Sequence, residues 1–279
     1  MTYLLKTIRA LLPSPIKKII RLYLHDSIRF KRLNKIFTLD NSNNKYNIEN
    51  YGEICYFGQL NLSYNLIRKS GNSNILLIIY HLMKDNGIFL EADPKIDYLP
   101  AFMIERYLGL QKNPINKSLG ISIEKSYKFT FVRNPYIRAV SMFREKVITG
   151  KIKFDEFNDI HDSINGFRSF VKFLERDGTK KNRHFKSQTN HLFFSAQNFD
   201  FIGRLENFSS DFMRMLDFLP VKISNQTRDL INNRKNTGHV TLSENYYKKY
   251  YDNDIAEKIY QLYEDDFTNF RYSKETFDE

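Results

Sequence analysis

The sequence predicts an α/β fold, because strand-like and helical segments alternate along its 279 residues. Two segments, residues 65–80 and 128–148, carry this prediction most clearly. Each has a short apolar run, then a turn with glycine or proline, then an apolar stretch of helical length. Turns that lead from a strand into a helix can bind anions, so the same two segments also bear on function.

The expected elements follow in chain order. Candidate strands are Ile54–Phe57, Tyr64–Ile67, Phe129–Val132 and Phe199–Ile202. Candidate helices cover residues 73–86, 99–109, 135–148, 163–176, 205–218 and 243–270. An Asn-rich linker, residues 40–50, precedes them. We therefore expect an N-terminal arm with its linker over residues 1–50 and one folded domain over residues 51–279.

The first segment has the composition of an anion site. The strand-like residues Leu66 and Ile67 are followed by Lys69, Ser70, Gly71, Asn72, Ser73 and Asn74, and then by the helical run. Unpaired N–H groups and the helix dipole favour negative charge at a helix N-terminus, and Lys69 adds a mobile cation. A Walker loop is excluded, because its lysine follows the second glycine and here Lys69 precedes Gly71.

The second segment is F-V-R-N-P-Y-I-R-A-V-S at residues 131–141. Asn134 and Pro135 break the strand, and proline suits the first turn of a helix. Arg133 is then at the carboxyl end of the strand, and Ser141 is two turns into the helix. Two anion sites at the carboxyl ends of strands indicate a ligand with two separated phosphates.

These motifs resemble the PAPS-dependent carbohydrate sulfotransferases of the family 2 type, including their bacterial members. In that family the 5′-phosphosulfate loop is strand-P-K-x-x-x-[ST]-[ST]-helix, and the 3′-phosphate site is strand-V-R-[DNH]-P-[FY]-x-R-x-x-S. Residues 131–141 match the second pattern almost position by position. The first match is looser, because Arg68 replaces the usual proline and Asn74 a common hydroxyl.

Two further segments agree with the resemblance and occur in the expected order. R-H-F-K-S-Q at residues 183–188 resembles the family's H-[WF]-x-[PS]-Q element, and residues 199–207 resemble its D-F-[IV]-G-[RK]-x-E element. An Asn- and Lys-rich stretch at 232–237 and a closing helix also agree. The resemblance covers roughly residues 62–272 and implies a P-loop-like three-layer fold, with a mostly parallel central sheet flanked by helices.

The resemblance also implies a function: transfer of a sulfuryl group from PAPS to a hydroxyl of a carbohydrate, such as a surface glycan or a glycolipid precursor, with PAP as the leaving group. Residues 69–74 would hold the 5′-phosphosulfate, and Arg133 and Ser141 the 3′-phosphate. Lys69 would stabilise the bridging oxygen as its charge grows. The implied reaction needs no metal.

The base that accepts the proton of the acceptor hydroxyl is less well specified. His184, in the R-H-F-K-S-Q element, is the first candidate, and a histidine that only hydrogen-bonds the backbone is the alternative. Glu91 and Asp93 are rival bases, about twenty residues after Lys69.

Composition is compatible with this function. A net charge of +11 suits polyanionic partners but also solubility alone. The single cysteine, Cys55, excludes an internal disulfide and favours a reducing compartment, so we expect a cytoplasmic protein. Residues 1–35 form a basic amphipathic stretch broken by prolines. That stretch either contacts the anionic inner face of a membrane peripherally or packs on the folded domain.

Two other functions stay open at this stage. One is a nucleotide-dependent kinase or NTPase with an atypical P-loop. The other is a non-enzymatic basic module that binds polyanions or membranes, which rests on charge and on an aromatic content of 15%. Nucleic acid is not an expected partner.

Overall fold

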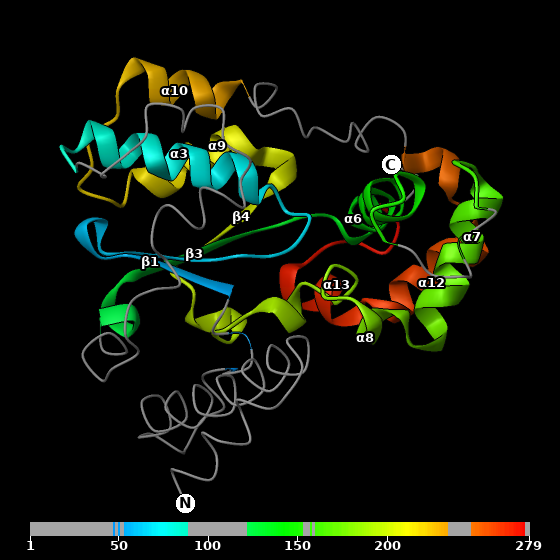
Figure 1. The fold of residues 1–279 in the computed structure, drawn as a ribbon. Helices are drawn as coiled ribbons and strands as arrows, with labels where there is room; N and C mark the ends of the chain where they lie inside the picture. Colours follow the sequence, from blue (N-terminus) through cyan, green and yellow to red (C-terminus); the bar gives the residue numbers. More distant parts are fainter. Residues whose placement is uncertain are drawn as a thin grey trace, which may run out of the picture.

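The central sheet joins segments that are far apart in the sequence. The computed structural model describes residues 47, 50, 53–88, 122–152, 157, 160–233 and 247–276. Within them, β1 (Ile54–Phe57), β2 (Leu62–Asn65), β3 (Tyr127–Val132) and β4 (Phe201–Arg204) lie side by side in that order. β1 pairs antiparallel with β2, whereas β3 runs parallel to both β2 and β4 (Figure 1). The carboxyl ends of β2, β3 and β4 therefore meet at one edge.

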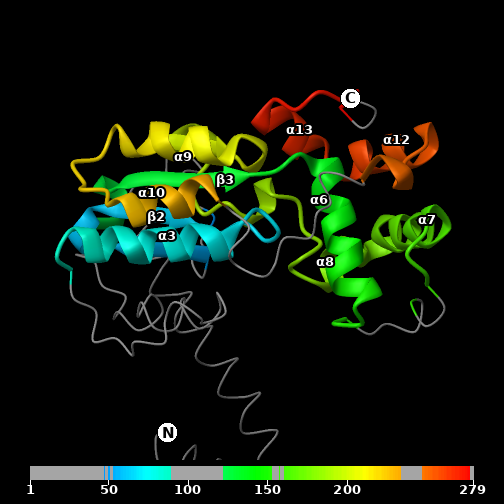
Figure 2. The same ribbon diagram turned by 90° about the horizontal axis from the view of Figure 1, so that it is seen from above.

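Helices cover one face of this sheet. α3 (Asn72–Asp85), α9 (Phe208–Leu216) and α10 (Asn225–Asn232) lie together over it (Figures 1 and 2). Phe131 stacks on Phe212 of α9, with 5.6 Å between the ring centroids. Gly203 of β4 makes room for the Phe131 ring, because a Cβ atom at Gly203 would lie 2.5 Å from a carbon of that ring.

The other face is covered by short turns and a C-terminal helix. The 3₁₀ turns Thr189–His191 and Ala196–Asn198 lie on this side, as does the end of α13 (Glu264–Phe270). Val132 packs there against Leu192 and Phe270. The sheet is thus the middle of three layers, which confirms the predicted mostly parallel α/β fold.

A second group of helices extends from the carboxyl edge of the sheet (Figure 2). α6 (Pro135–Met142) continues as a π-helical segment, Phe143–Ile148. Around it lie α7 (Ile164–Phe173) with its π-helical extension Leu174–Gly178, α8 (Thr179–Lys181), the turn Tyr247–Tyr250 and α12 (Asn253–Leu262). Their shared core is largely aromatic, with Phe143, Phe167 and Tyr250 fully buried.

The predicted elements are largely confirmed, with shifts at their ends. The strand Ile54–Phe57 and the helical stretch 135–148 have the expected limits, although its last six residues are π-helical. The strand expected at Tyr64–Ile67 lies two residues earlier, because Leu66 and Ile67 leave the sheet to pack in the core below the loop. The strand expected at Phe199–Ile202 lies two residues later, since Asp200 first accepts a hydrogen bond from the Lys128 amide.

One predicted helix was wrong as a single element. Of residues 243–270, those from Tyr247 onward form a turn, α12 and α13. Asp252 caps α12, and Tyr263 separates α12 from α13 because its φ of −126° is not helical. The helix expected at residues 99–109 lies outside the described residues, as does nearly all of the N-terminal arm.

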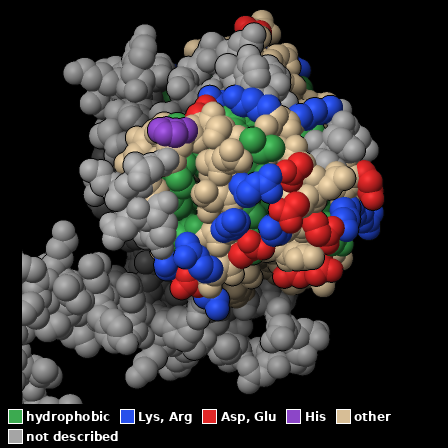
Figure 3. Space-filling view, turned by 90° about the vertical axis from the view of Figure 1, so that its right-hand side faces the viewer, with side chains coloured by type: hydrophobic (Ala, Val, Ile, Leu, Met, Phe, Trp, Pro, Cys, Tyr) green, Lys and Arg blue, Asp and Glu red, His purple; other side chains and the backbone are tan. Residues whose placement is uncertain are grey.

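The positive charge of the chain is balanced on the outer face of the second helical group. Figure 3 shows basic and acidic side chains intermixed there. Arg168 of α7 pairs with Asp252 and Asp254, and Lys258 pairs with Asp254 as well. Basic and acidic side chains of the described residues are therefore paired on this face. Among the described helices, none is long and apolar enough to cross a bilayer.

We expect Asn134→Ala to lower the free energy of unfolding by about 1–2 kcal/mol, because Asn134 is the N-cap of α6. Its side-chain oxygen accepts hydrogen bonds from the amides of Tyr136 and Ile137, at 2.9 and 3.4 Å. Chemical denaturation measures the loss. The control is Thr276→Ala, which removes the partner of the Asn134 side-chain nitrogen and an exposed hydrogen bond to the Ser273 carbonyl, and should cost about 0.5 kcal/mol or less. Equal stability of Asn134→Ala and the unmodified protein would contradict the capping role.

Candidate active site

The loop between β2 and α3 makes a tight turn with a strained lysine. The Ser70 amide donates to the Ile67 carbonyl at 3.2 Å, which closes a four-residue turn over Ile67–Ser70. Lys69, the third residue of that turn, has a φ of +72°. A positive φ at this position defines a type II turn, and glycine usually occupies it. A lysine here stores conformational strain, which is characteristic of functional sites.

The N-terminus of α3 is available to an external anion. Its N-cap is Gly71, at a φ of +82°, and no side chain caps the helix. A Cβ at Gly71 would lie 2.6 Å from a methyl carbon of Leu205, so both conformation and space require glycine. Of the helices that the structure describes, α6, α7, α10 and α12 begin with a capping side chain, whereas α8, α9 and α13, like α3, do not. The first turn of α3 also has no acidic residue, which leaves the helix dipole uncompensated.

Two asparagines lie in that first turn. The Tyr64 hydroxyl donates to the Asn72 side-chain oxygen at 2.6 Å, which fixes its orientation. The Asn74 side-chain oxygen is buried without a hydrogen-bond partner in the described part of the chain. A buried polar atom without a partner is costly, so this position fits a site that a polar ligand completes.

Arginines from the second segment hold the backbone of the first loop. Arg138 of α6 is 1% exposed, and its Nε donates to the Arg68 carbonyl at 3.0 Å. One terminal nitrogen of Arg133 lies 3.5 Å from the Lys69 carbonyl. Burial lowers the pKa of Arg138, although Asp266 opposes the shift, and arginine stays charged even so. The two predicted anion loops are therefore in direct contact.

Gln188 connects the same two loops through its carboxamide. Its side-chain oxygen accepts from the Ser70 hydroxyl at 3.0 Å and from the Arg133 amide at 2.8 Å. Its side-chain nitrogen donates to the Arg133 carbonyl at 2.7 Å. The Gln188 amide in turn donates to Asp266, at 2.7 Å. Because Gln188 is fully buried, this arrangement fixes the spacing of the two loops.

The Lys69 ammonium is paired with a carboxylate that the sequence analysis did not select. Glu145, in the π-helical segment after α6, hydrogen-bonds Lys69 and also lies 3.0 Å from the Lys146 ammonium. Burial lowers the pKa of Lys69 to about 8, although Glu145 opposes the shift. Burial would raise the pKa of Glu145, but Lys69 and Lys146 hold it far below its ordinary value. At neutral pH the pair is therefore ionic.

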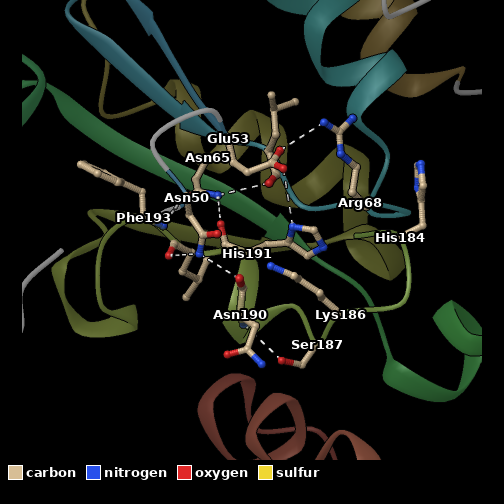
Figure 4. Close-up of polar contacts among 12 residues, drawn as sticks. Asn50, Glu53, Asn65, Arg68, His184, Lys186, Ser187, Asn190, His191 and Phe193 are labelled. Carbon is tan, nitrogen blue, oxygen red and sulfur yellow. Dashed lines mark hydrogen bonds and ion pairs between the residues drawn. The ribbon is translucent and has the colours of Figure 1, made fainter. Parts of the chain in front are cut away.

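His184 lies in a cationic environment beside this pair. Burial, then Lys146 and Arg68, lowers its pKa to about 3, and Lys69 contributes in the same direction. Its Nδ1 is buried without a hydrogen-bond partner among the described residues. In Figure 4 its ring lies beside Arg68, which is directed toward Glu53. His184 is thus neutral in the ligand-free protein, and a polar partner is missing at its Nδ1.

The structure brings most of the predicted site residues together. Lys69 interacts electrostatically with Arg133 and with His184. Ser70 closes the turn, and the next residues form the start of α3: Gly71, Asn72, Ser73 and Asn74. Ser141 lies in α6 and is 1% exposed. Glu91 and Asp93 lie outside the described residues. In the part of the chain that is described, no group of three His, Cys, Asp or Glu residues is placed to hold a metal ion.

Two residues of the site were missed, and a third, Arg138, was expected only to lie near Arg133 and Ser141. Glu145 follows Ser141 by four positions, so helical spacing could have indicated it. Gln188 ends the R-H-F-K-S-Q element, but nothing in the sequence shows that its carboxamide pairs with Arg133. Arg138 belongs to the recognised motif, yet its backbone partners depend on the tertiary structure.

Comparison with known proteins agrees with this geometry. Carbohydrate sulfotransferase 12 from Xenopus laevis is 27% identical over 181 residues, and the match covers 55% of this chain and 42% of that protein. The protein of the same name from Mus musculus is 26% identical over 185 residues, with the same coverage. The match thus spans less than half the length of these relatives. No solved structure matches the chain.

The family-level match covers far more of the chain. Residues 53–273 match the sequence pattern of the sulfotransferase family. This range contains both anion loops, Gln188, Glu145 and His184. The chain therefore belongs to the sulfotransferase family.

Proposed function

We propose that the protein transfers a sulfuryl group from PAPS to a hydroxyl of a carbohydrate. The observation that carries the proposal is the contact between two anion-binding loops, one with Lys69 and one with Arg133, at the carboxyl edge of a parallel sheet. Open α/β sheets bind ligands at this edge. PAPS has negative groups on both sides of its ribose, which suits two adjacent sites.

The two loops fit the donor in different ways. The open N-terminus of α3 suits the 5′-phosphosulfate, and the Ser73 hydroxyl and the Asn74 side-chain nitrogen in its first turn could donate hydrogen bonds to it. Arg133 suits the 3′-phosphate, because a guanidinium can donate two parallel hydrogen bonds to a phosphate, and the Ser141 hydroxyl would add a third. Gln188 would keep the two sites at the spacing of one nucleotide.

Lys69 would stabilise the charge that develops on the leaving group. In the reaction a bond forms between the acceptor oxygen and sulfur, while the bond between sulfur and the bridging oxygen breaks. PAP leaves with that electron pair. Burial favours the reaction electrostatically, because an ammonium in a site from which water is excluded interacts more strongly with a growing negative charge.

His184 is the proposed base for the acceptor's proton. In the free protein its neutral imidazole is a weak base, because burial and nearby cations lower its pKa to about 3. The negative charge of the donor would offset those cations and raise this pKa. His184 would then be basic enough to accept the proton only when the donor is bound. Glu91 and Asp93 remain the alternative bases.

The carbohydrate acceptor rests on the names of the relatives, which are carbohydrate sulfotransferases. A surface glycan or a glycolipid precursor is the specific acceptor class that we propose. We also propose a cytoplasmic location, supported by the presence of only one cysteine, Cys55, in the sequence, which excludes an internal disulfide. Peripheral contact of residues 1–35 with an anionic membrane is supported by their basic amphipathic pattern.

Calorimetry with PAP tests the proposed donor. We expect PAP to bind in the micromolar range without added metal. A rise in melting temperature with ATP only in the presence of magnesium would instead indicate a kinase or NTPase. A rise only with polyanions would indicate a binding module. Turnover is then tested with radiolabelled PAPS and a panel of surface glycans.

A matched pair of arginine variants checks the second loop. Arg133→Ala should weaken PAP binding by about 1.5–3 kcal/mol, the range for hydrogen bonds to charged groups. Arg168→Ala removes the same side chain from the outer face of α7 and should leave PAP binding unchanged. Equal affinities of the two variants would show that Arg133 does not bind the ligand.

The affinity for PAP should depend on pH through Lys69. Because the pKa of Lys69 is lowered to about 8, its charge is lost as the pH rises through that value, and the affinity should fall above about pH 8. Glu145→Gln removes a group that raises this pKa, so the fall should begin at a lower pH. Titrations between about pH 7 and pH 9.5 measure both onsets. Lys69→Ala is the control and should abolish the fall, whereas an unchanged onset in Glu145→Gln would contradict the coupling.

Replacing His184 should separate catalysis from donor binding. His184→Ala should keep its affinity for PAP and lower kcat by about 100-fold or more, as expected for loss of a general base. The unmodified enzyme should lose activity as the pH falls through the pKa of His184 in the donor complex, and the variant should lack that acidic limb. His161→Ala, which changes an exposed histidine, should behave like the unmodified enzyme. Full turnover by His184→Ala from about pH 6 to about pH 9, a range that includes the ordinary histidine pKa of about 6.5, would exclude His184 as the base.

A further inference from the structure

Arg68 directly precedes Lys69 in the turn between β2 and α3. It is the second residue of the turn Ile67–Ser70, and its φ is not positive, whereas that of Lys69 is +72°. This position of a type II turn favours proline, because the ring fixes φ near the required value. An arginine provides no such restriction. The strained conformation of Lys69 must therefore be maintained by contacts.

Glu53 supplies one of these contacts. It directly precedes β1 and is 9% exposed, and its Oε2 lies 3.3 Å from a terminal nitrogen of Arg68 (Figure 4). The pair is an ion pair without a hydrogen bond, since Glu53 Oε2 has no hydrogen-bond partner among the described residues. The Glu53 carbonyl accepts from the Leu66 amide at 2.7 Å, so the backbone of Glu53 is fixed to the strand end that leads into the turn. Arg68 is accordingly held at both ends, by Glu53 at its guanidinium and by Arg138 at its carbonyl.

The second neighbour of the Glu53 carboxylate, His191, carries no positive charge. His191 Nδ1 lies 3.9 Å from Glu53 Oε1. Burial, then Arg138 and Arg68, holds the pKa of His191 far below its ordinary value, so its ring is neutral. Asn65 fixes the position of His191, because its side-chain nitrogen donates to the His191 carbonyl at 3.1 Å. Of these two neighbours, Arg68 is thus the one whose positive charge balances the Glu53 carboxylate.

We propose that Glu53 is a positioning residue for the donor loop: its ion pair with Arg68 holds the turn in the form that directs Lys69 into the active site. A side-chain contact thus does what a proline ring would do at residue 68. The inference rests on the proposed function for its link to PAP. Its structural part concerns the turn alone and can be measured without any ligand.

Three variants test the proposal. Glu53→Gln removes the charge that holds Arg68. Glu53→Gln combined with Arg68→Pro removes both charges and restores the turn by proline, so it leaves no unpaired buried charge. Asp254→Asn, which removes an exposed carboxylate from α12, is the control. Hydrogen exchange of the Ser70 amide reports on the turn, and calorimetry with PAP reports on the site.

In Glu53→Gln the Ser70 amide should exchange at least about fivefold faster than in the unmodified protein, because its bond to Ile67 closes the turn. PAP binding should weaken about tenfold, within the range expected for releasing a strained backbone. The double variant should exchange more slowly and bind PAP more tightly than Glu53→Gln. Asp254→Asn should match the unmodified protein in both measurements.

Two results would overturn the proposal: unchanged exchange of the Ser70 amide in Glu53→Gln, or no recovery in the double variant. If Glu53→Gln does not fold, the double variant decides, and rapid exchange of its Ser70 amide contradicts the proposal. A failure of the unmodified protein to bind PAP is a separate result. It would refute the proposed donor, while the exchange measurements would still decide the role of Glu53 in the turn.

Discussion

The site depends on one buried carboxamide. Gln188 hydrogen-bonds Ser70 of the first loop and both backbone groups of Arg133 in the second. The two loops are more than sixty residues apart in sequence, and no helix or strand contains both. A backbone amide paired with a fully buried side chain is expensive to release, so the spacing of the loops is a property of the folded core. Asp266 continues this network by accepting from the Gln188 amide.

Arginine has a structural purpose in this site, besides the proposed binding of the 3′-phosphate by Arg133. Arg138 and Arg133 are directed at the carbonyls of Arg68 and Lys69. Uncovered carbonyls would repel an anion, and the guanidinium groups neutralise these two acceptors within the loop. The high arginine content of the motif therefore also orients the peptide groups of its neighbour.

The sequence was informative where chemistry depends on neighbouring residues and less so where it depends on tertiary contacts. The motif at residues 131–141 predicted a strand, a break and a helix, and the structure has all three. The loops of Lys69 and Arg133 were predicted to follow the carboxyl ends of strands, and the structure shows in addition that these two strands are parallel neighbours. Gln188 could not be found in this way, since its partner Arg133 is distant in sequence. The same holds for Glu53, because its partner Arg68 comes close only when β1 and β2 pair. The break at Tyr263 was missed because its hydroxyl bonds the distant Phe185 carbonyl.

The π-helical segment Phe143–Ile148 has a consequence for how the protein can vary. In a π-helix each hydrogen bond spans one residue more than in an α-helix, so the extra residue sets the direction of the side chains around it. Glu145 and Lys146 reach the site from this segment. Loss of a single residue here would restore α-helical geometry and turn both side chains away. The length of this segment therefore sets the direction in which Glu145 and Lys146 point.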